Sequence, residues 1–329
     1  MSWSELSNLL EVEFPIIQAP IGSATCPELA AAVSNAGGLG TLSVTWRANA
    51  EMRHLLERTR RLTNKPFAIN LVLENDVEDK LKICLEENVK IISLFWGTSR
   101  RHIKTAHQAG AIVLQSVGSV AEAKEAVVVG ADAIVVQGWK AGGHIRGQTA
   151  TFALLPAVVD AVFPKPVIAS GGLADGRGIV AALALGASGV WLGTRFLLSR
   201  EARAHSLYKQ NLLAATVDDT VYSTLFDVGW ENAPHRTLRN STVAMWEAAG
   251  KPASGERPRE GEPIAIQKDE ARIVRYSDTI PLPETKGDVE ALALYAGQSV
   301  GLVAEIKSAA EIVNDLVKET EQTLAKLKL

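Results

Sequence analysis

The chain of 329 residues is poor in several features that mark particular classes of protein. Its two cysteines, Cys26 and Cys84, are too few for a disulfide framework and lack the spacing of metal ligands, so we expect both to be small buried hydrophobic residues. No group of His, Cys or carboxylate residues has convincing metal-binding spacing, so no metal is expected. An excess of one charge is also missing, because 34 Lys and Arg stand against 37 Asp and Glu, a net charge of −3. Without a basic block, nucleic acid is not an expected partner.

Long hydrophobic runs are missing as well. The most apolar stretch, residues 179–193, is interrupted by glycine and serine and falls short of the roughly 20 residues that a membrane-spanning helix needs. Residues 1–13 have neither a basic start nor a small-residue cleavage site, so no signal peptide is expected. These absences predict a cytoplasmic protein with no membrane partner.

Up to about residue 200, short apolar segments alternate with segments rich in Ala, Leu and Glu. Most of the apolar segments are continuous, which is typical of strands buried on both faces. The eight expected strands are residues 15–19, 40–44, 67–72, 90–95, 111–115, 133–137, 166–170 and 189–192. Helices are expected between strands at 27–36, 77–87, 119–129 and 175–185. This alternation predicts a parallel α/β sheet.

Two features favour a closed TIM (β/α)8 barrel over an open, doubly wound sheet. The strand count is eight, and turns containing glycine directly follow the last two strands, at residues 170–172 and 192–194. TIM barrels commonly bind phosphate at these two loops, although plain connecting turns would also account for the glycines. An open sheet would place a G-x-G-x-x-G motif after its first strand, where this chain reads Pro20-Ile21-Gly22-Ser23.

The pattern changes after residue 199. A helix is expected at 205–215, and residues 222–283, which contain several Trp and Pro, are expected to form an insertion over one face of the barrel. Residues from about 298 to 329 predict one long amphipathic helix that packs on the surface. Its apolar positions include Ile306, Ala310, Val313 and Val317. The expected division is therefore a barrel with its C-terminal helix, residues 1–221 and 284–329, and an inserted substrate-side segment, residues 222–283.

One segment concentrates residues that suit catalysis. The run from Gln137 to His144, which reads QGWKAGGH, follows the sixth expected strand and so lies at the C-terminal face, where barrel active sites form. Its glycines allow backbone N–H groups to approach a flat or anionic ligand. His144 is then available as a base near neutral pH, unless it is a plain surface residue. The other histidines in expected helices, which we expect to be surface residues, are His54, His102, His107 and His205.

Several short motifs occur together in the order typical of one family. They are Gln18-Ala19-Pro20, Ala68-Ile69-Asn70-Leu71, Gln137-Gly138 with Ala141-Gly142-Gly143-His144, Ala169-Ser170-Gly171-Gly172-Leu173, Gly193-Thr194-Arg195-Phe196 and Tyr295-Ala296-Gly297-Gln298-Ser299. Over nearly its whole length the chain resembles the nitronate monooxygenases, formerly called 2-nitropropane dioxygenases. The resemblance implies a TIM barrel with non-covalently bound FMN, and it implies that His144 is the catalytic base.

The resemblance also implies which residues bind FMN. They are Ala19, Pro20, Asn70, Gln137, Ala141, Gly142, Gly143, Gly171, Gly172, Trp191, Leu192, Gly193 and Thr194. Gly172 and the run from Trp191 to Thr194 would hold the phosphate and adjoining atoms, in agreement with the phosphate loops inferred from the strand count. The fold alone gives no reason to prefer FMN over another phosphorylated ligand.

The reaction implied by the resemblance is oxidation of alkyl nitronates, and of nitroalkanes, by O2 to carbonyl compounds and nitrite. With a nitroalkane, His144 would remove the α-proton; with a nitronate it would position the anion, and as an imidazolium it would stabilise the negative charge. Related barrels include FMN-dependent NAD(P)H reductases of quinones and enoyl thioesters, which the flavin motifs do not separate from nitronate monooxygenases. A barrel that binds a phosphorylated ligand without flavin is a further alternative.

Fewer sequence observations support the expected substrate contacts than support the expected FMN contacts. Lys140 stands where many family members have glutamate, and it either favours a substrate with its own carboxylate or points into solvent. The full set of expected contacts is Lys140, His235, Arg236 and Ser299. Trp230, Arg239 and Trp246 of the insertion could close over an anionic substrate, or the insertion is a solvated surface. A homodimer is left open.

Overall fold

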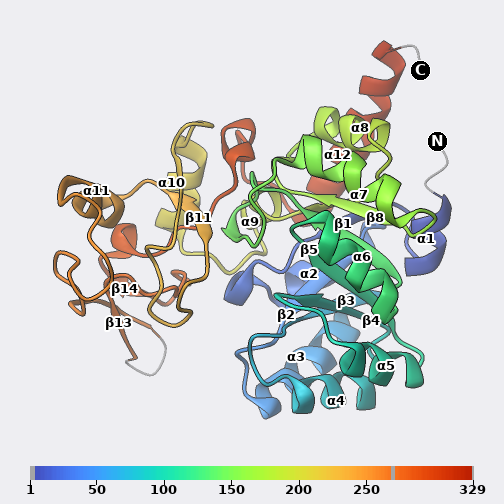
Figure 1. Cartoon of the computed structure of the whole chain (residues 1–329), viewed down its shortest axis with the longest axis horizontal. Coiled ribbons are helices and arrows are strands. Elements are labelled where there is room, and N and C mark those ends of the chain that lie inside the picture. Colours follow the sequence, from blue (N-terminus) through green and yellow to red (C-terminus); the bar gives the residue numbers. More distant parts are fainter. Residues whose placement is uncertain (1–3, 268–270, 328–329) are drawn as a thin grey trace.

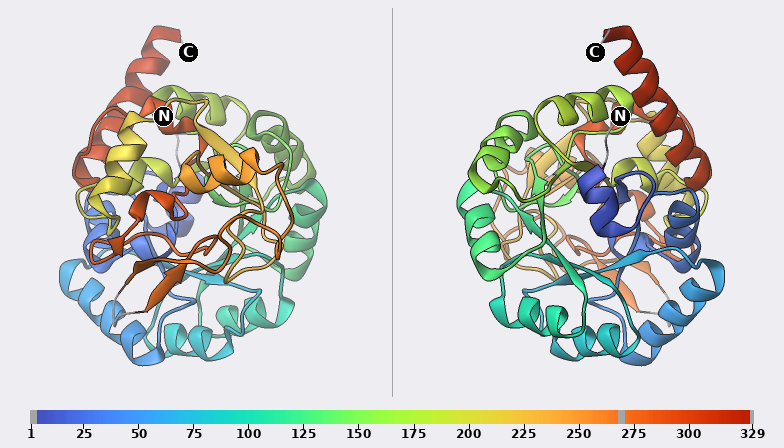
Figure 2. Two further views of the ribbon diagram at one scale, coloured as in Figure 1. Left: turned by 90° about the vertical axis from the view of Figure 1, so that its left-hand side faces the viewer. Right: turned by 90° about the vertical axis from the view of Figure 1, so that its right-hand side faces the viewer.

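Eight parallel strands surrounded by helices form a TIM-type barrel (Figure 1, Figure 2). A computed structural model describes residues 4–267 and 271–327. Neighbouring strands follow the order β1-β9-β8-β6-β5-β4-β3-β2, and each pair is parallel. The barrel closes between its first two strands, where Leu39 N donates to Ile16 O and Gln18 N donates to Leu39 O, both at 3.0 Å. The predicted fold class is therefore confirmed.

The barrel strands lie within two residues of their predicted positions. They are β1 (Ile16–Gln18), β2 (Gly40–Ser43), β3 (Phe67–Val72), β4 (Ile91–Phe95), β5 (Ile112–Val117), β6 (Ala133–Gln137), β8 (Val167–Ser170) and β9 (Gly189–Leu192). The surrounding helices are α2 (Pro27–Asn35), α3 (Asn49–Leu62), α4 (Glu78–Glu86), α5 (Arg100–Gln108), α6 (Val120–Val129), α7 (Thr151–Val162) and α8 (Gly176–Ala184). Continuous apolar runs mark these strands because both of their faces are buried.

Side chains of the barrel strands alternate between the barrel interior and the helices outside. Ile17, Ala68, Leu114 and Trp191 pack together inside the barrel. Leu6 and Leu10 of α1 (Ser4–Leu10) join this cluster from one end, where the N-terminal helix lies across the barrel (Figure 2, right). The opposite end, at the carboxyl ends of the strands, is therefore the end that is free to hold a site.

The C-terminal helix begins later than the sequence predicts. Helix α12 (Ala309–Leu327) is preceded by a short 3-10 turn, Gln298–Leu302, and by extended chain that includes Ile306. The helix starts where it does because of a capping box: Glu311 N donates to the Ser308 hydroxyl at 3.2 Å, and Ser308 N donates to the Glu311 carboxylate at 2.8 Å. From there Val313 is buried, and α12 packs against α8 and α2.

The chain between β9 and α12 covers the carboxyl ends of the strands (Figure 1, left). Its elements are α9 (Thr194–Leu197), α10 (Ser206–Ala214), β10 (Thr220–Ser223), β11 (His235–Leu238), α11 (Ser241–Ala248), β12 (Pro263–Ile266), β13 (Arg272–Val274) and β14 (Lys286–Gly287). They form two small antiparallel sheets: β10 and β11 pair with β7 (Gly143–His144), a short strand from the loop after β6, in the order β10-β11-β7, and the second sheet has the order β13-β12-β14. The sheets extend slightly beyond residues 222–283 on both sides, and the division of the chain into barrel and insertion stays a prediction.

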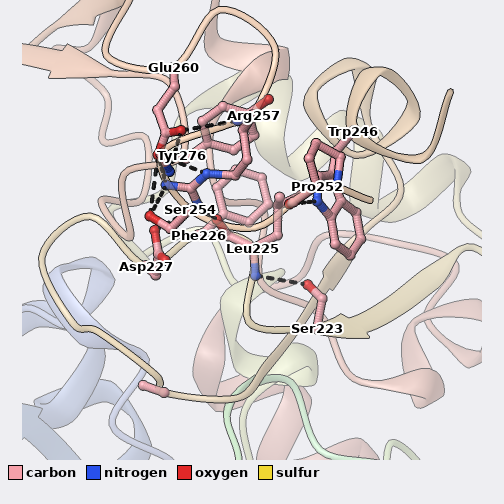
Figure 3. Close-up of polar contacts among 12 residues, drawn as sticks. Ser223, Leu225, Phe226, Asp227, Trp246, Pro252, Ser254, Arg257, Glu260 and Tyr276 are labelled. Atoms are coloured by element: carbon pink, nitrogen blue, oxygen red, sulfur yellow. Dashed lines mark hydrogen bonds and ion pairs between the residues drawn. The ribbon is translucent and has the colours of Figure 1, made fainter. Parts of the chain in front are cut away.

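A buried arginine links several turns of this covering segment (Figure 3). The Arg257 side chain is 3% exposed and donates to the Asp227 carboxylate at 2.7 Å, to Leu225 O at 2.8 Å and to Glu260. Its guanidinium also lies 4.4 Å from the ring centroid of Tyr276. A buried cation with two carboxylates and an aromatic face is well compensated, so this cluster holds residues 225–227 and 254–260 in one arrangement.

Within residues 4–267 and 271–327, no helix has both the length and the apolar composition needed to cross a bilayer. The same residues contain no cluster of three or more His, Cys, Asp or Glu side chains that could hold a metal ion.

Candidate active site

A cavity of about 470 Å3 lies between the carboxyl ends of the barrel strands and the covering segment. Its size falls within the range of pockets that hold cofactors and small substrates. Every predicted cofactor residue except Leu192 lines it, and so do His144 and Ser299. The sequence motifs therefore meet at the carboxyl ends of the barrel strands, where TIM barrels form their sites, while the roles of these residues remain predictions.

The loop that carries His144 is held from two sides. Its strand β7 (Gly143–His144) pairs with β11 of the covering segment, placing His144 opposite His235 and Gly143 opposite Arg236. From the barrel side, the Gln137 amide donates to His144 O at 2.9 Å. Gly142 must be glycine, because a Cβ there would lie 2.4 Å from Gly297 N. The His144 loop and residues 295–299 are thus packed backbone against backbone.

His144 sits among aromatic rings. Its ring centroid lies 4.2 Å from that of Trp230, 5.3 Å from Tyr295 and 6.1 Å from Trp96. No carboxylate of the described chain bonds to the imidazole, and its buried Nε2 has no hydrogen-bond partner there. Burial of the imidazole lowers the pKa of His144 to about 3, and the nearby His235 contributes in the same direction. The ring is therefore neutral at pH 7, which suits a proton acceptor and argues against a resident imidazolium.

The glycine turns after β8 and β9 face the cavity with backbone. Gly171 and Gly172 have φ values of +97° and +78°, a conformation that side chains disfavour. A Cβ on Gly171 would lie 2.9 Å from Ala141 N, so this turn also packs against the His144 loop. Thr194, at the end of the next turn, accepts a hydrogen bond from Gly297 N at 3.0 Å through its hydroxyl. Exposed backbone N–H groups of such turns suit a phosphate.

The cavity also contains a side-chain hydrogen-bond acceptor that no described residue donates to. Gln137 Oε1 is buried and has no partner among the described residues, while the amide nitrogen of the same side chain is used by His144 O. Asn70 is buried on β3, with its amide nitrogen 3.2 Å from the Ser93 hydroxyl. Buried amides beside glycine turns and aromatic walls fit a flat heterocycle that carries N–H groups and a phosphate.

Four of the predicted contacts do not reach the cavity. The Leu192 side chain packs outward among the helices, because it alternates with Trp191, which points inward. His235 is fully buried: its Nε2 accepts from Phe226 N at 3.2 Å, its Nδ1 lies 2.9 Å from Ala233 O, and burial lowers its pKa to about 4. It is a satisfied core histidine that supports His144 from behind, with 5.5 Å between the ring centroids.

Arg236 and Lys140 are occupied around Trp139. Arg236 is 2% exposed, donates to Trp139 O at 2.9 Å and lies 5.0 Å from the Trp139 ring centroid. The Lys140 ammonium lies 4.8 Å from the same centroid. Neither lines the cavity: Arg236 holds β11 to the His144 loop, and Lys140 stacks on its neighbour, while contact of either residue with a substrate stays a prediction.

Sequence reasoning missed several residues of the site. Trp46 and Phe95 line the cavity, and Trp96 belongs to the rings around His144. Trp96 directly follows β4 and Trp46 lies shortly after β2, so both could have been predicted from the rule that the ends of barrel strands face the site. Asp278 and Tyr295 also line the cavity. No sequence feature of this kind marks Asp278, because it lies in the covering segment and reaches the cavity only through the way that segment packs.

Comparison with known proteins shows which family this chain belongs to. The family model described as nitronate monooxygenase matches residues 3–79 and 74–319. The chain belongs to the nitronate monooxygenase family. The family places it among flavin-dependent oxidoreductases and confirms the resemblance seen in the sequence motifs.

Three proteins that are similar to this chain carry different names. A nitronate monooxygenase of Pseudomonas aeruginosa is 33% identical, over 95% of this chain and 98% of that protein. A 5-hydroxy-7a-methyl-1-oxo-octahydro-1H-indene-4-carboxyl-CoA dehydrogenase of Rhodococcus jostii is also 33% identical, over 95% of this chain and 94% of that protein. The solved structure of FabK from Thermotoga maritima superposes with a TM-score of 0.82 at 34% identity, covering 99% of this chain and 98% of that one.

Proposed function

We propose that this chain is an FMN-dependent nitronate monooxygenase, which oxidises alkyl nitronates and nitroalkanes with O2 to carbonyl compounds and nitrite. The observation that carries the proposal is the neutral His144, held among aromatic rings in a cavity framed by glycine turns. A neutral base in an apolar site suits removal of a proton from a carbon acid, and the α-carbon of a nitroalkane is such an acid.

The cofactor side of the cavity is assigned from the groups that would bind it. Gly171, Gly172, Gly193 and Thr194 would hold the FMN phosphate, while Asn70 and Gln137 would meet polar atoms of the ring. When bound, the flavin supplies the redox chemistry, and the protein orients substrate and cofactor.

The chain's own contribution is the handling of one proton. His144 accepts the α-proton of a nitroalkane, so the imidazolium and the nitronate charge appear together as an ion pair. That pair offsets the burial that keeps the free imidazole neutral. The Gln137 amide fixes the backbone of His144, and the rings of Trp230 and Tyr295 exclude water from the imidazole. A preformed nitronate needs no proton transfer and is only positioned.

A second candidate is an FMN-dependent oxidoreductase of thioesters. The CoA-thioester dehydrogenase of Rhodococcus jostii aligns over 339 positions, compared with 360 for the Pseudomonas nitronate monooxygenase at the same identity, so its alignment needs fewer gaps. The α-proton of an acyl thioester presents the same task to His144. NAD(P)H-dependent reduction of an enoyl thioester or a quinone would use the same cavity.

Anaerobic titration of the FMN-loaded protein separates these candidates. Preformed ethylnitronate, NADH, NADPH and a saturated acyl-CoA are added separately while the visible flavin band is recorded. The proposal predicts bleaching by ethylnitronate and none by NADH or NADPH. Bleaching by a pyridine nucleotide or an acyl-CoA, with no response to ethylnitronate, would reject it in favour of the second candidate. Failure to take up FMN would reject both.

A further inference from the structure

The cavity carries an uneven set of charges. Among the described residues that line it, none is Lys or Arg, and the only carboxylate is Asp278. The other titratable side chains that line the cavity carry no charge at pH 7: His144 is a neutral imidazole, and burial raises the pKa of Tyr208 and of Tyr295. The described wall of the cavity therefore presents one negative charge and no positive side chain to compensate it.

The position of Asp278 is fixed by its own backbone. Asp278 N donates to Val228 O at 3.0 Å, and Asp278 O accepts from the Tyr295 hydroxyl at 3.1 Å. The side chain lies against Gly229, where a Cβ would come within 2.2 Å of Asp278 Oδ1. Gly229 has a φ of +119°, so both its conformation and its missing side chain make room for the carboxylate.

Within residues 4–267 and 271–327 the carboxylate has no ion pair and no hydrogen bond from another residue, and only its own backbone N–H bonds to it. It is partly buried, and burial raises its pKa to about 6. A half-buried carboxylate that no other described residue pairs with costs free energy, and a ligand group that donates a hydrogen bond or carries a positive charge would lower that cost.

Asp278 lies one layer of side chains away from His144. Gly229, which contacts its carboxylate, immediately precedes Trp230, and the Trp230 ring lies 4.2 Å from that of His144. Tyr295, which donates to its carbonyl, lies 5.3 Å from the same imidazole. A substrate whose reacting carbon meets His144 would therefore extend its other end along the wall that contains Asp278.

We propose that Asp278 determines which substrates this cavity accepts: it rejects a tail that carries a carboxylate and favours a tail with a hydroxyl or ammonium group. The inference rests on the proposed function, because it names the substrate class of that same site. It also replaces the expectation of an anionic substrate drawn from Lys140 and Arg236, whose side chains lie around Trp139 instead.

The test compares substrates of matched length. kcat/KM is measured at about pH 8 for 1-nitropropane, 3-nitropropan-1-ol, 3-nitropropylamine and 3-nitropropionate, with wild type, Asp278→Asn and Asp278→Glu. The control is Asp218→Asn, an exposed aspartate on the loop before β10. In wild type 3-nitropropionate should be the poorest substrate. Asp278→Asn should raise its kcat/KM relative to 1-nitropropane by about tenfold and lower that of the amine by a similar factor. Asp278→Glu and Asp218→Asn should keep the wild-type order.

Binding of unreactive analogues separates this inference from the proposed function. Butyrate, butan-1-ol and butylamine are titrated into the FMN-loaded protein, and tryptophan fluorescence reports binding through Trp46 and Trp230, which line the cavity. If butylamine and butan-1-ol bind more tightly than butyrate and Asp278→Asn removes the difference, the inference holds even when no nitro compound is oxidised. If wild type binds butyrate as tightly as butylamine, or if Asp278→Asn leaves the order unchanged, the inference is wrong even when nitroalkanes are oxidised.

Discussion

At the scale of single residues, the site depends on two histidines kept neutral by burial. His144 lines the cavity, whereas His235 lies behind it and uses both ring nitrogens within the protein. Both have pKa values below the usual 6.5, at about 3 and about 4. The same feature that makes His144 a proton acceptor therefore also makes the folded state sensitive to acid.

His235 should make folding stability depend on pH. Its folded pKa of about 4 lies below the ordinary 6.5, so between these values the unfolded chain binds more protons. Stability is fully present above pH 6.5 and is lost as the pH falls toward 4, by about 3 kcal/mol for this one group. Urea unfolding of wild type and His235→Gln between pH 4.5 and 7.5 measures this. The difference between the two should shrink steadily as the pH falls, and a difference that is constant with pH would contradict the assignment.

How far the sequence predicts the site also depends on single residues. His144, Asn70 and the glycine turns could be predicted because they directly follow barrel strands or belong to family motifs. That His235 and Arg236 lie buried outside the cavity wall could not be predicted, because a buried, satisfied side chain looks the same in a sequence as one that faces a substrate. Asp278 was missed because its approach to His144 spans more than 130 residues of chain and depends on how the covering segment packs.

At the scale of elements, the buried strands were predictable and the irregular elements were not. Strand β7 has two residues and exists only because β11, about 90 residues later, pairs with it. Helix α12 was predicted too long, although the Ser308–Glu311 capping box is visible in the sequence and would have placed its start. Apolar periodicity alone does not locate helix ends, because an apolar residue such as Ile306 fits the helical pattern but lies exposed in the extended chain before the helix.

The Arg257 cluster should contribute strongly to the stability of the covering segment. Arg257→Met would leave Asp227 and Glu260 without their buried cation, and we expect a loss of about 3 kcal/mol in the free energy of unfolding. The matched control is Arg259→Met, two residues along. The Arg259 side chain is 59% exposed and pairs with Glu262, so its loss should cost about 0.5 kcal/mol. Chemical denaturation measures both, and equal losses would mean that burial of the Arg257 cluster has no special effect.

At the level of the whole molecule, the barrel and the covering segment lie against each other (Figure 1), and the cavity lies between them. The barrel supplies the glycine turns and the strand ends, and the covering segment supplies Trp230, Asp278 and Tyr295. Ligand binding should therefore stabilise the entire fold, because a ligand in this cavity contacts both parts.

FMN should raise the melting temperature of the cofactor-free protein more than riboflavin does. A ligand present at about 100 times its Kd adds about 2.7 kcal/mol of stability, which corresponds to an increase of several degrees. Riboflavin offers the same ring without the phosphate that Gly171, Gly172 and Thr194 are proposed to hold. Thermal unfolding with each ligand at the same concentration gives the comparison. Equal shifts would mean that the glycine turns do not bind phosphate.

His144 is proposed to be a neutral base that removes the α-proton of a nitroalkane. To test this role, nitroethane and preformed ethylnitronate are compared as substrates of wild type and His144→Ala, each loaded with FMN. In His144→Ala, kcat/KM for nitroethane should fall by about 10²–10⁴-fold, while that for ethylnitronate should fall by less than about tenfold. Equal losses for the two substrates, large or small, would contradict the assignment of His144 as the base.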